Sequence, residues 1–473
     1  MPLPASEINA EHLELVRAWY DGKPDKLNWA SIGYRKLVAH YYGLLIPPDA
    51  SVLEVGCGSG ELLRRITARR KVGIDLSEKQ IAAARESCPD CEFHVQAAEA
   101  LELPERFDCI VISDTLNFAA DVQGVLERLH AVSHPATRLI INYPSALWRP
   151  ILALARGLGL KPAEPPCNWL ATSDIKGLMD LADWSPLVVQ QRILYPVPGF
   201  GIGSFINRWL GPLFPWSCLT VFCVARPVRS RETGPLTVSV VIPARNEAGN
   251  IEAAVRRTPD MGGGTELIFV EGHSKDNTWE EIERVARENP ARRIKTLRQT
   301  GSGKGDAVRA GFAVAEGDLF MILDADLTVP PEELPKFYDA IVSGRAEFAN
   351  GSRLVYPMEK AAMRFLNMCA NKAFGILFTW ILGQSLKDTL CGTKVLRRAD
   401  YERIAANRAY FGDFDPFGDF DLLFGAAHLN MKIVDVPVRY RDRTYGSTNI
   451  HRWRHGWLLL RMVCFAARKL KFV

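Results

Sequence analysis

The sequence predicts an α/β protein of two doubly wound domains, each a mostly parallel sheet with helices between its strands. Three observations predict this fold class. Apolar runs alternate with segments of helical period, the alternation starts again after residue 236, and both series open on an apolar run that ends in a glycine-rich or polar turn. The 473 residues are enough for two or three domains of ordinary size.

The first series contains five apolar runs that we interpret as buried strands. They cover residues 51–55, 71–74, 109–112, 138–141 and 219–224. Segments of helical period, such as 80–87 and 122–130, lie between them. We expect this domain to cover residues 1–228. A proline-rich stretch at about 144–215 fits neither period, and we expect it to form an insertion or a lid of the domain.

The second series predicts another domain over residues 236–473. Its first strands are expected at 238–242, 266–270 and 319–323, again with helical segments between them. Residues 225–236, between the two series, are rich in Arg, Pro, Thr and Gly and offer little that a core could bury. This composition is typical of an exposed linker.

The composition, with 48% hydrophobic and 24% charged residues, is that of an ordinary globular protein. A net charge of +4 is too small to indicate binding of nucleic acid. Most of the ten cysteines lie in apolar runs, so we expect reduced thiols in a cytoplasmic protein. Cys88 and Cys91 form a CxxC pair, but the second pair that a metal site needs is not visible. Residues 1–10 lack the pattern of a signal peptide, and no apolar run reaches the roughly 18 residues that cross a bilayer.

A glycine-rich turn follows the first predicted strand. Gly56, Gly58 and Gly60 stand at alternate positions, so the backbone can turn sharply and approach a ligand, with helix N–H groups pointing at it. Asp75 lies 19 residues beyond Gly56, where a carboxylate can accept hydrogen bonds from both hydroxyls of a ribose. Such a turn alone is also compatible with NAD, FAD or a structural role, although GxGxG differs from the GxGxxG dinucleotide fingerprint.

With its neighbouring motifs, this turn resembles the class I S-adenosylmethionine-dependent methyltransferases, which have a Rossmann-like fold. The resemblance is carried by residues 54–60, 73–77 and 97–101 and extends over about 35–226. It implies that Glu54 belongs to the cofactor site and that the three glycines face the methionine part of S-adenosylmethionine. It also implies that Asp75 contacts the ribose and that Ala98 and Glu99 contact the adenine.

The methyl acceptor is not named by the sequence. Asp114, Thr115 and Asn117 follow the strand at 109–112, where this family places substrate contacts, and a loop-forming polar cluster explains them equally well. Methyl transfer from a sulfonium depends mainly on the alignment of donor and acceptor, so no base is obligatory. A domain that merely binds S-adenosylmethionine, or that is a structural module, is the alternative.

Two aspartates follow the apolar run 319–323 in the second series. Alternation places Asp324 and Asp326 on one side of the strand, where two carboxylates repel each other unless a cation sits between them. A divalent ion there, Mg²⁺ or Mn²⁺, would neutralise the diphosphate of a nucleotide sugar. The run Gly301–Gly305 is not a phosphate-binding P-loop, because Arg298 stands where the first glycine should be.

These features together resemble the family 2 glycosyltransferases with the GT-A fold, over residues 237–449. Within the family, the sequence looks most like the synthases that load mannose or glucose onto dolichyl or polyprenyl phosphate. The resemblance is carried by segments 240–247, 303–305, 324–326, 351–353, 388–394 and 443–449. The chain departs from the family pattern at Glu271-Gly272, where two aspartates are common, at Thr328, a position that can supply a metal ligand, and at Asn449, which replaces a lysine.

The resemblance implies a role for each matching residue. The nucleotide sugar would contact Pro243, Arg245, Glu247, Glu271, Lys304 and Asp324. Asp326, with Asp324, would ligate the metal, and the acceptor would meet Arg353, Lys394 and the phosphate-holding Arg443. Asp419 would act as a base or orient the acceptor. The alternatives are a surface salt bridge for Arg443 and, for Asp419 and Asp421, a charge pair at a helix N-terminus.

The last twenty residues or so mix apolar and basic side chains, Trp457 and Leu460 beside Arg461, Arg468 and Lys469. We expect these residues to form a basic amphipathic helix. Such a helix can lie in the headgroup plane on the inner face of a membrane, and packing of the helix against the domain core explains the pattern equally well. We therefore expect a bifunctional enzyme that transfers a methyl group from S-adenosylmethionine and a sugar from a nucleotide sugar to a polyprenyl-phosphate or saccharide acceptor.

Overall fold

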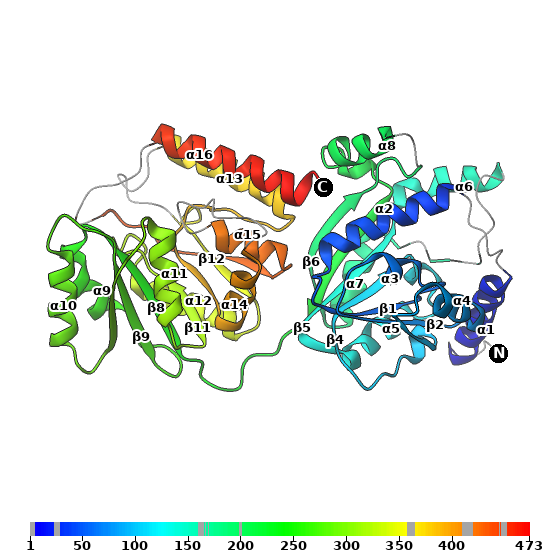
Figure 1. The fold of residues 1–473 in the computed structure, drawn as a ribbon, viewed down its shortest axis with the longest axis horizontal. Coiled ribbons are helices and arrows are strands. Elements are labelled where there is room, and N and C mark those ends of the chain that lie inside the picture. Colours follow the sequence, from blue (N-terminus) through cyan, green and yellow to red (C-terminus); the bar gives the residue numbers. More distant parts are fainter. Residues whose placement is uncertain are drawn as a thin grey trace. The chain divides into compact units, whose positions relative to one another are not determined.

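The computed structural model describes residues 5–22, 29–158, 165, 167–168, 170–197, 201–356, 365–408, 420–443, 445 and 452–473. Met1–Val228 form one compact unit and Arg229–Lys471 another. Figure 1 shows that each unit is a twisted sheet with helices packed on it. Within the described part of the chain, no helix combines the length and the apolar character needed to cross a bilayer.

The first unit is built on a seven-stranded sheet of order β3-β2-β1-β4-β5-β7-β6. The strands are β1 Ser51–Val55, β2 Arg70–Asp75, β3 Glu92–Val95, β4 Phe107–Ser113, β5 Ser133–Pro144, β6 Trp184–Arg192 and β7 Thr220–Pro227. β1 to β5 run parallel, and β7 pairs antiparallel with both β5 and β6. The strand order reverses between β1 and β4, the place where doubly wound sheets bind ligands.

Helices cover both faces of this sheet. They are α1 Ala5–Asp21, α2 Trp29–Leu45, α3 Glu61–Arg65, α4 Glu78–Ser87, α5 Val122–Arg128, α6 Arg149–Gly157, α7 Thr172–Leu181 and α8 Ile202–Phe205, with short turns η1 Ala98–Ala100, η2 Leu116–Phe118, η3 Leu129–Val132, η4 Ala146–Trp148, η5 Ile206–Leu210 and η6 Pro215–Ser217. Every residue of β1 is buried, and Leu53 and Val55 pack in the core with the apolar residues of α5 and α7.

The stretch at 144–215 is more than an insertion or a lid. It contributes the edge strand β6 to the sheet and the helix α7 that precedes this strand. The sequence pattern does not predict β6 as a strand. Pro186 interrupts the hydrogen-bond ladder at a register shift, and the polar residues Gln190 and Gln191 interrupt the apolar run. An edge strand tolerates both features, since one of its sides needs no partner.

The second unit contains another seven-stranded sheet, of order β10-β9-β8-β11-β13-β12-β14. Its strands are β8 Val238–Ala244, β9 Thr265–Glu271, β10 Arg293–Arg298, β11 Leu319–Ile322, β12 Phe348–Ser352, β13 Lys394–Arg397 and β14 Ile433–Pro437. β13 is antiparallel to both of its neighbours, and the other pairs are parallel.

The helices of this unit are η7 Ala248–Asn250, α9 Ile251–Arg257, α10 Thr278–Glu288, α11 Lys304–Val314, η8 Pro331–Glu333, α12 Leu334–Val342, α13 Phe365–Leu382, α14 Arg398–Ala406, α15 Phe420–His428, α16 Arg452–Ala466 and η10 Ala467–Lys471. Its core joins the inner residues of β8, β9 and β11 to α9, α10 and α12. The carboxyl ends of β8, β9 and β11 meet at one edge, because these strands are parallel.

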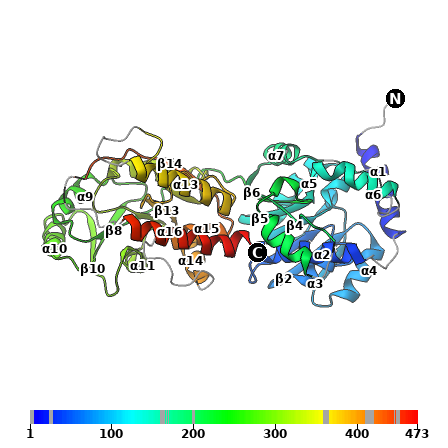
Figure 2. The same ribbon diagram turned by 90° about the horizontal axis from the view of Figure 1, so that it is seen from above.

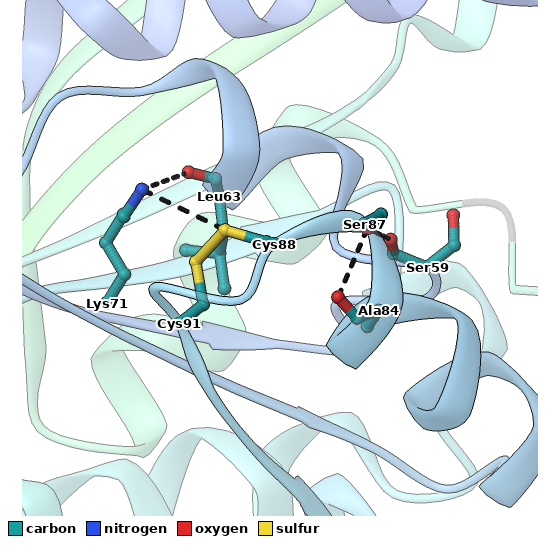
Figure 3. The surroundings of a disulfide bond; sticks show 7 residues. All are labelled: Ser59, Leu63, Lys71, Ala84, Ser87, Cys88 and Cys91. Atoms are coloured by element: carbon teal, nitrogen blue, oxygen red, sulfur yellow. Dashed lines mark hydrogen bonds between the residues drawn. A yellow bond between two sulfur atoms is a disulfide. The ribbon is translucent and has the colours of Figure 1, made fainter.

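Cys88 and Cys91 form a disulfide at the end of α4, so the expectation of reduced thiols is wrong for this pair (Figure 3). The turn after α4 brings their Cα atoms within 5.5 Å, a separation that a disulfide can bridge. Ser87, next to Cys88, donates from its hydroxyl to the Ser59 carbonyl at 2.7 Å. The end of α4 is thereby tied to the glycine-rich turn.

Candidate active sites

The glycine-rich turn of the first unit has the geometry that its sequence predicts. Gly56, Gly58 and Gly60 all have positive φ, 74°, 51° and 72°, a region that strongly favours glycine. A side chain on Gly56 would overlap Thr115, so that glycine also permits close packing against the loop after β4. The turn leads directly into α3, whose first N–H groups are directed at the same space.

Asp75 ends β2 beside this turn. Its carboxylate accepts hydrogen bonds from the backbone N–H groups of Gly58 at 2.8 Å and Ser77 at 2.9 Å. Burial raises the pKa of Asp75 above its usual value, although these hydrogen bonds favour the charged form. Each carboxylate oxygen has a second lone pair, which remains available for the hydroxyl groups of a ribose.

Ala98 and Glu99 lie in η1, after β3. The Glu99 carboxylate accepts a hydrogen bond from the backbone N–H of Ala120 at 2.9 Å. This contact joins η1 to the loop that follows η2. Glu99 therefore has a structural partner of its own besides any contact to a cofactor.

Glu54 provides a test of whether the pocket suits S-adenosylmethionine. It is buried at the end of β1, and its Oε2 has no hydrogen-bond partner. Burial raises the pKa of Glu54 well above its usual value, against the opposing charge of Arg35. A buried carboxylate oxygen without a hydrogen-bond partner is costly unless a ligand supplies a cation or a donor. The ammonium of the cofactor's methionine part has that chemistry, so the residues present fit S-adenosylmethionine.

A polar network lies next to this pocket, and the sequence identified one of its members. Asp114 accepts hydrogen bonds from the amide of Asn142 at 2.8 Å and from the phenol of Tyr34 at 3.2 Å. Its φ of 52° is unusual for a residue other than glycine. Tyr34 and Asn142 stand 80 and 28 residues away in the sequence, so no local pattern could have pointed to them.

In the second unit, Asp324 lies just beyond the end of β11. Its carboxylate forms an ion pair with the ammonium of Lys304, the first residue of α11, at 2.7 Å. A side chain on Gly392 would overlap both groups, so the loop before β13 passes directly over this pair. Burial would raise the pKa of Asp324, but the charges of Lys304, Arg353 and Lys394 outweigh burial and lower it.

Asp326 has a cation partner of its own. The Arg443 guanidinium contacts the Asp326 carboxylate at 2.5 Å and the Glu247 carboxylate at 2.9 Å. The other oxygen of Asp326 accepts from the hydroxyl of Thr328 at 2.9 Å. Because β11 ends at Ile322, both aspartates belong to a turn instead of one side of a strand. Each aspartate has a separate protein cation beside it, Lys304 for Asp324 and Arg443 for Asp326.

Glu247 closes this cluster on the side of β8. Its second oxygen accepts from the Asn250 amide at 2.7 Å. Burial raises the pKa of Glu247 to about 7, with the charges of Asp326 and Asp276 adding to the effect and Arg443 opposing it. Arg443 is therefore a bridge between two carboxylates, more than the surface salt bridge that the alternative describes.

The donor set at Asp326 fits a hard divalent cation. Among the described residues, no three carboxylate, imidazole or thiol side chains are grouped as a ready-made cage. Mg²⁺ is commonly held by one or two carboxylates, the rest of its ligands being water and substrate phosphates. Asp326 with the Thr328 hydroxyl provides such a partial oxygen set, provided that Arg443 yields the position it occupies.

Arg353 and Lys394 lie deeper than the sequence suggests. Arg353 is bound by both oxygens of Asp388, at 2.7 and 2.9 Å, and the amide of Asn371 donates to the same carboxylate. Burial opposes ionisation of Asp388, but Arg353 outweighs it and lowers the pKa of Asp388 to about 2. Lys394 is fully buried, and its ammonium donates to the Cys391 carbonyl.

Three buried hydroxyl groups near this ion pair lack hydrogen-bond partners. They belong to Ser352, which precedes Arg353, and to Thr389 and Thr393, which lie in the loop from Asp388 to Lys394. A buried hydroxyl without a partner loses the hydrogen bonds that water would make. Sequence reasoning missed all three, since only burial without a partner distinguishes them.

The remaining predicted residues are placed around the same edge. Pro243 is half-buried in β8, and Arg245 is exposed just after that strand. Glu271, at the end of β9, accepts from the backbone N–H of Ser274 at 2.5 Å. Asp419 lies outside the described residues. Its neighbour Asp421 pairs with Arg408 at 2.7 Å.

Two family models match the chain. Residues 239–405 match glycosyl transferase family 2, and residues 46–161 match a methyltransferase domain. The chain joins a methyltransferase domain to a family 2 glycosyltransferase domain. Both resemblances drawn from the motifs are thus confirmed, as is the fold class of two α/β domains.

The chain spans little more than half of the length of the curated relatives that it matches. The dolichol-phosphate mannosyltransferase of Pyrococcus furiosus is 30% identical over 220 residues, 46% of this chain and 59% of that protein. The undecaprenyl-phosphate 4-deoxy-4-formamido-L-arabinose transferase of Pseudomonas aeruginosa is 29% identical over 182 residues, 36% of this chain and 50% of that protein. A solved glucosyl-3-phosphoglycerate synthase from Mycobacterium tuberculosis is 20% identical, and the match covers 50% of this chain and 80% of that protein with a TM-score of 0.36.

Proposed function

We propose that the glycosyltransferase domain transfers a sugar from a nucleotide sugar to a polyprenyl phosphate or a lipid-linked saccharide, with the help of a divalent cation. One observation carries the proposal. Glu247, Lys304, Asp324, Asp326 and Arg443 converge at the edge where β8, β9 and β11 end. The names of the two curated relatives, which act on dolichol phosphate and undecaprenyl phosphate, support the acceptor class.

In this proposal the donor lies along that edge. Pro243, Arg245, Glu247 and Glu271 line the nucleoside, and Asp324 contacts its ribose or diphosphate. Lys304 and Arg443 hold the diphosphate oxygens, a task suited to the ammonium at the start of α11 and to a forked guanidinium. Asp326 ligates the cation, Mg²⁺ or Mn²⁺, which when bound neutralises charge on the departing diphosphate.

The acceptor phosphate is proposed to bind near the Arg353–Asp388 pair. Arg353 and Lys394 supply positive charge, and the unpaired hydroxyls of Ser352, Thr389 and Thr393 are donors that a phosphate oxygen could satisfy. Asp419 remains a proposed base or orienting residue for the acceptor.

We also propose that this domain binds a membrane peripherally, on the cytoplasmic side, through α13 and α16. Both figures draw these helices side by side (Figures 1 and 2). One side of α16 is buried through Leu459, Met462, Val463 and Ala466. Ile376, Leu377, Trp457 and Leu460 remain exposed, beside the exposed basic residues Lys372, Arg461, Arg468 and Lys469. A paired surface of this composition suits the headgroup layer.

For the methyltransferase domain we propose methyl transfer from S-adenosylmethionine, supported by the buried Oε2 of Glu54, which has no hydrogen-bond partner. The glycines hold the methionine part, Asp75 the ribose, and Ala98 with Glu99 the adenine. Calorimetry with S-adenosylhomocysteine tests this, with Asp75→Ala as the weakened variant. A wild type that does not bind the compound would leave the domain as a structural module, which is the alternative function.

The glycosyltransferase proposal is tested by thermal unfolding in the presence of Mn²⁺ and a series of nucleotide sugars. A matching donor raises the midpoint by mass action, since it binds the native state. Asp326→Ala should abolish the Mn²⁺-dependent part of the shift while its own midpoint stays near that of the wild type. Full donor binding or sugar transfer by this variant, or by the wild type in a chelator, would refute the metal role.

A further inference from the structure

The methyltransferase domain exposes an apolar helix face that neither proposed activity uses. Leu147, Ile151, Leu154 and Leu158 follow one another at steps of four, three and four residues, so they lie along one face of η4 and α6. Each of these side chains is between 51% and 65% exposed, and α6 buries none of its residues. An amphipathic helix normally turns such a face to the core.

A second exposed apolar segment lies beside the first. Within residues 202–216, the side chains of Leu213, Phe214 and Trp216 are 55%, 47% and 65% exposed, and Ile202 and Phe205 are exposed as well. The indole N–H of Trp148 donates to the Ser217 carbonyl at 2.9 Å, which joins the start of α6 to the end of this segment. We call the exposed apolar side chains of 147–158 and 202–216 the apolar rim.

The apolar rim lies at the same edge of the sheet as the proposed cofactor site. Its first segment continues directly from the carboxyl end of β5, and its second segment leads into the start of the antiparallel strand β7. Both points belong to the edge of the sheet that carries the glycine-rich turn and Asp114.

The charges on these segments have one sign. Residues 145–158 and 201–217 contain Arg149, Arg156 and Arg208 and no aspartate or glutamate. Arg149 and Arg156 are spaced to lie opposite the apolar face of α6. A bare aliphatic face, aromatic side chains at its border and exclusively basic charges are the features of a helix that lies in a lipid interface.

We infer that the apolar rim is a bilayer-binding surface of the methyltransferase domain, which seats the mouth of its proposed cofactor site on an anionic lipid surface. Its residues differ from those proposed on α13 and α16, and the inference rests on the proposed methyl transfer and not on sugar transfer. The methyl acceptor would then reach the site from the headgroup layer.

The test is sedimentation of the full chain with vesicles of phosphatidylcholine, with and without phosphatidylglycerol. Ile151→Ser combined with Leu154→Ser should lower the partition coefficient about tenfold on the mixed vesicles, since two inserted aliphatic side chains are lost. Trp216→Ser should lower it in the same direction. Leu181→Ser, which removes a leucine that is 67% exposed in α7, is the matched control and should bind like the wild type.

A fourth variant separates the two surfaces. Trp457→Ser with Leu460→Ser removes the surface of α16, and binding through the apolar rim should persist at a reduced level. If this variant loses all binding, or if the Ile151/Leu154 variant sediments like the wild type, the apolar rim does not bind lipid. If the Ile151/Leu154 variant instead changes the mass of the protein in lipid-free sedimentation, the surface is a protein contact and the inference is wrong. A midpoint of thermal unfolding equal to that of the wild type confirms that each variant is folded.

Discussion

The guanidinium of Arg443 lies 2.5 Å from the carboxylate of Asp326, the residue proposed to ligate the metal. The same guanidinium lies 2.9 Å from Glu247. A cation that binds Asp326 must therefore compete with an arginine, unless the arginine moves to the donor. The diphosphate of a nucleotide sugar provides that new partner, since its oxygens bind guanidinium well. Metal and donor should accordingly bind together with positive coupling.

Arg443→Gln should separate the binding of metal from sugar transfer. Without the competing guanidinium, Mn²⁺ alone should bind about tenfold more tightly, the worth of one charge-assisted contact. Sugar transfer should fall at least tenfold, because the diphosphate loses a ligand. Titration calorimetry with Mn²⁺ gives the first quantity and a donor-turnover assay the second. Arg441→Gln, at an exposed arginine two residues away, is the control, and an unchanged Mn²⁺ affinity in Arg443→Gln would contradict the competition.

Gly392→Ala should damage the donor site without touching a charged residue. The new methyl group would overlap the Asp324 carboxylate and the Lys304 ammonium, so the ion pair must separate or the loop must move. We expect donor affinity to fall about tenfold or more, as for other steric intrusions into a packed site. Gly234→Ala, where a side chain meets open space, should leave donor affinity unchanged. Equal affinities for the two variants would show that the loop does not hold this pair in solution.

Asp388→Asn should destabilise the glycosyltransferase domain by about 3–5 kcal/mol, because it leaves the Arg353 guanidinium buried and uncompensated. Denaturant unfolding measures the loss. Asp339→Asn removes an exposed carboxylate that lies 3.8 Å from Arg231, and it should change the free energy of unfolding little. A small effect at Asp388 would show that water reaches the pair.

Asp388 also predicts a dependence on pH. Its pKa is lowered in the folded state to about 2, so its contribution to stability is complete above its unfolded value near 3.8 and is lost as the pH falls toward 2. As the pH falls from about 3.8 to about 2, the wild type should therefore lose about 2 kcal/mol more of its free energy of unfolding than Asp388→Asn does. Unfolding curves of both proteins from pH 5 downwards give this difference. Parallel curves would contradict the lowered pKa.

Glu54→Gln should have opposite effects on stability and on cofactor binding. The change replaces a buried carboxyl group whose Oε2 has no hydrogen-bond partner, so the unliganded domain should unfold at an equal or higher temperature. Affinity for S-adenosylhomocysteine should fall at least tenfold if Glu54 holds the ammonium of the ligand. Glu86→Gln, at an exposed glutamate of α4, should change neither property. A variant that binds the ligand normally would remove Glu54 from the cofactor site.

The local sequence predicts the first strands and the glycine-rich turn, because strands and turns depend on residues that are close together in the chain. Residues 51–55 were predicted as a strand and form β1, and Gly56, Gly58 and Gly60 have the positive φ angles expected of a glycine-rich turn. The edge strand β6 was missed, because a strand with one open side need not be uniformly apolar. Cys88 and Cys91 were expected to be reduced, since spacing alone does not reveal whether two thiols face each other.

By itself, the sequence determined that two α/β domains follow one another and which polar residues stand at the ends of their strands. Only the tertiary structure decided how these residues pair. Arg443 reaches Glu247 and Asp326 across 196 and 117 residues, and Tyr34 reaches Asp114 across 80. Such contacts depend on how the strands are ordered in a sheet. The entropic cost of closing the long loops between them varies little with loop length, so residues far apart in the sequence can meet. A local sequence pattern does not contain the information that predicts these contacts.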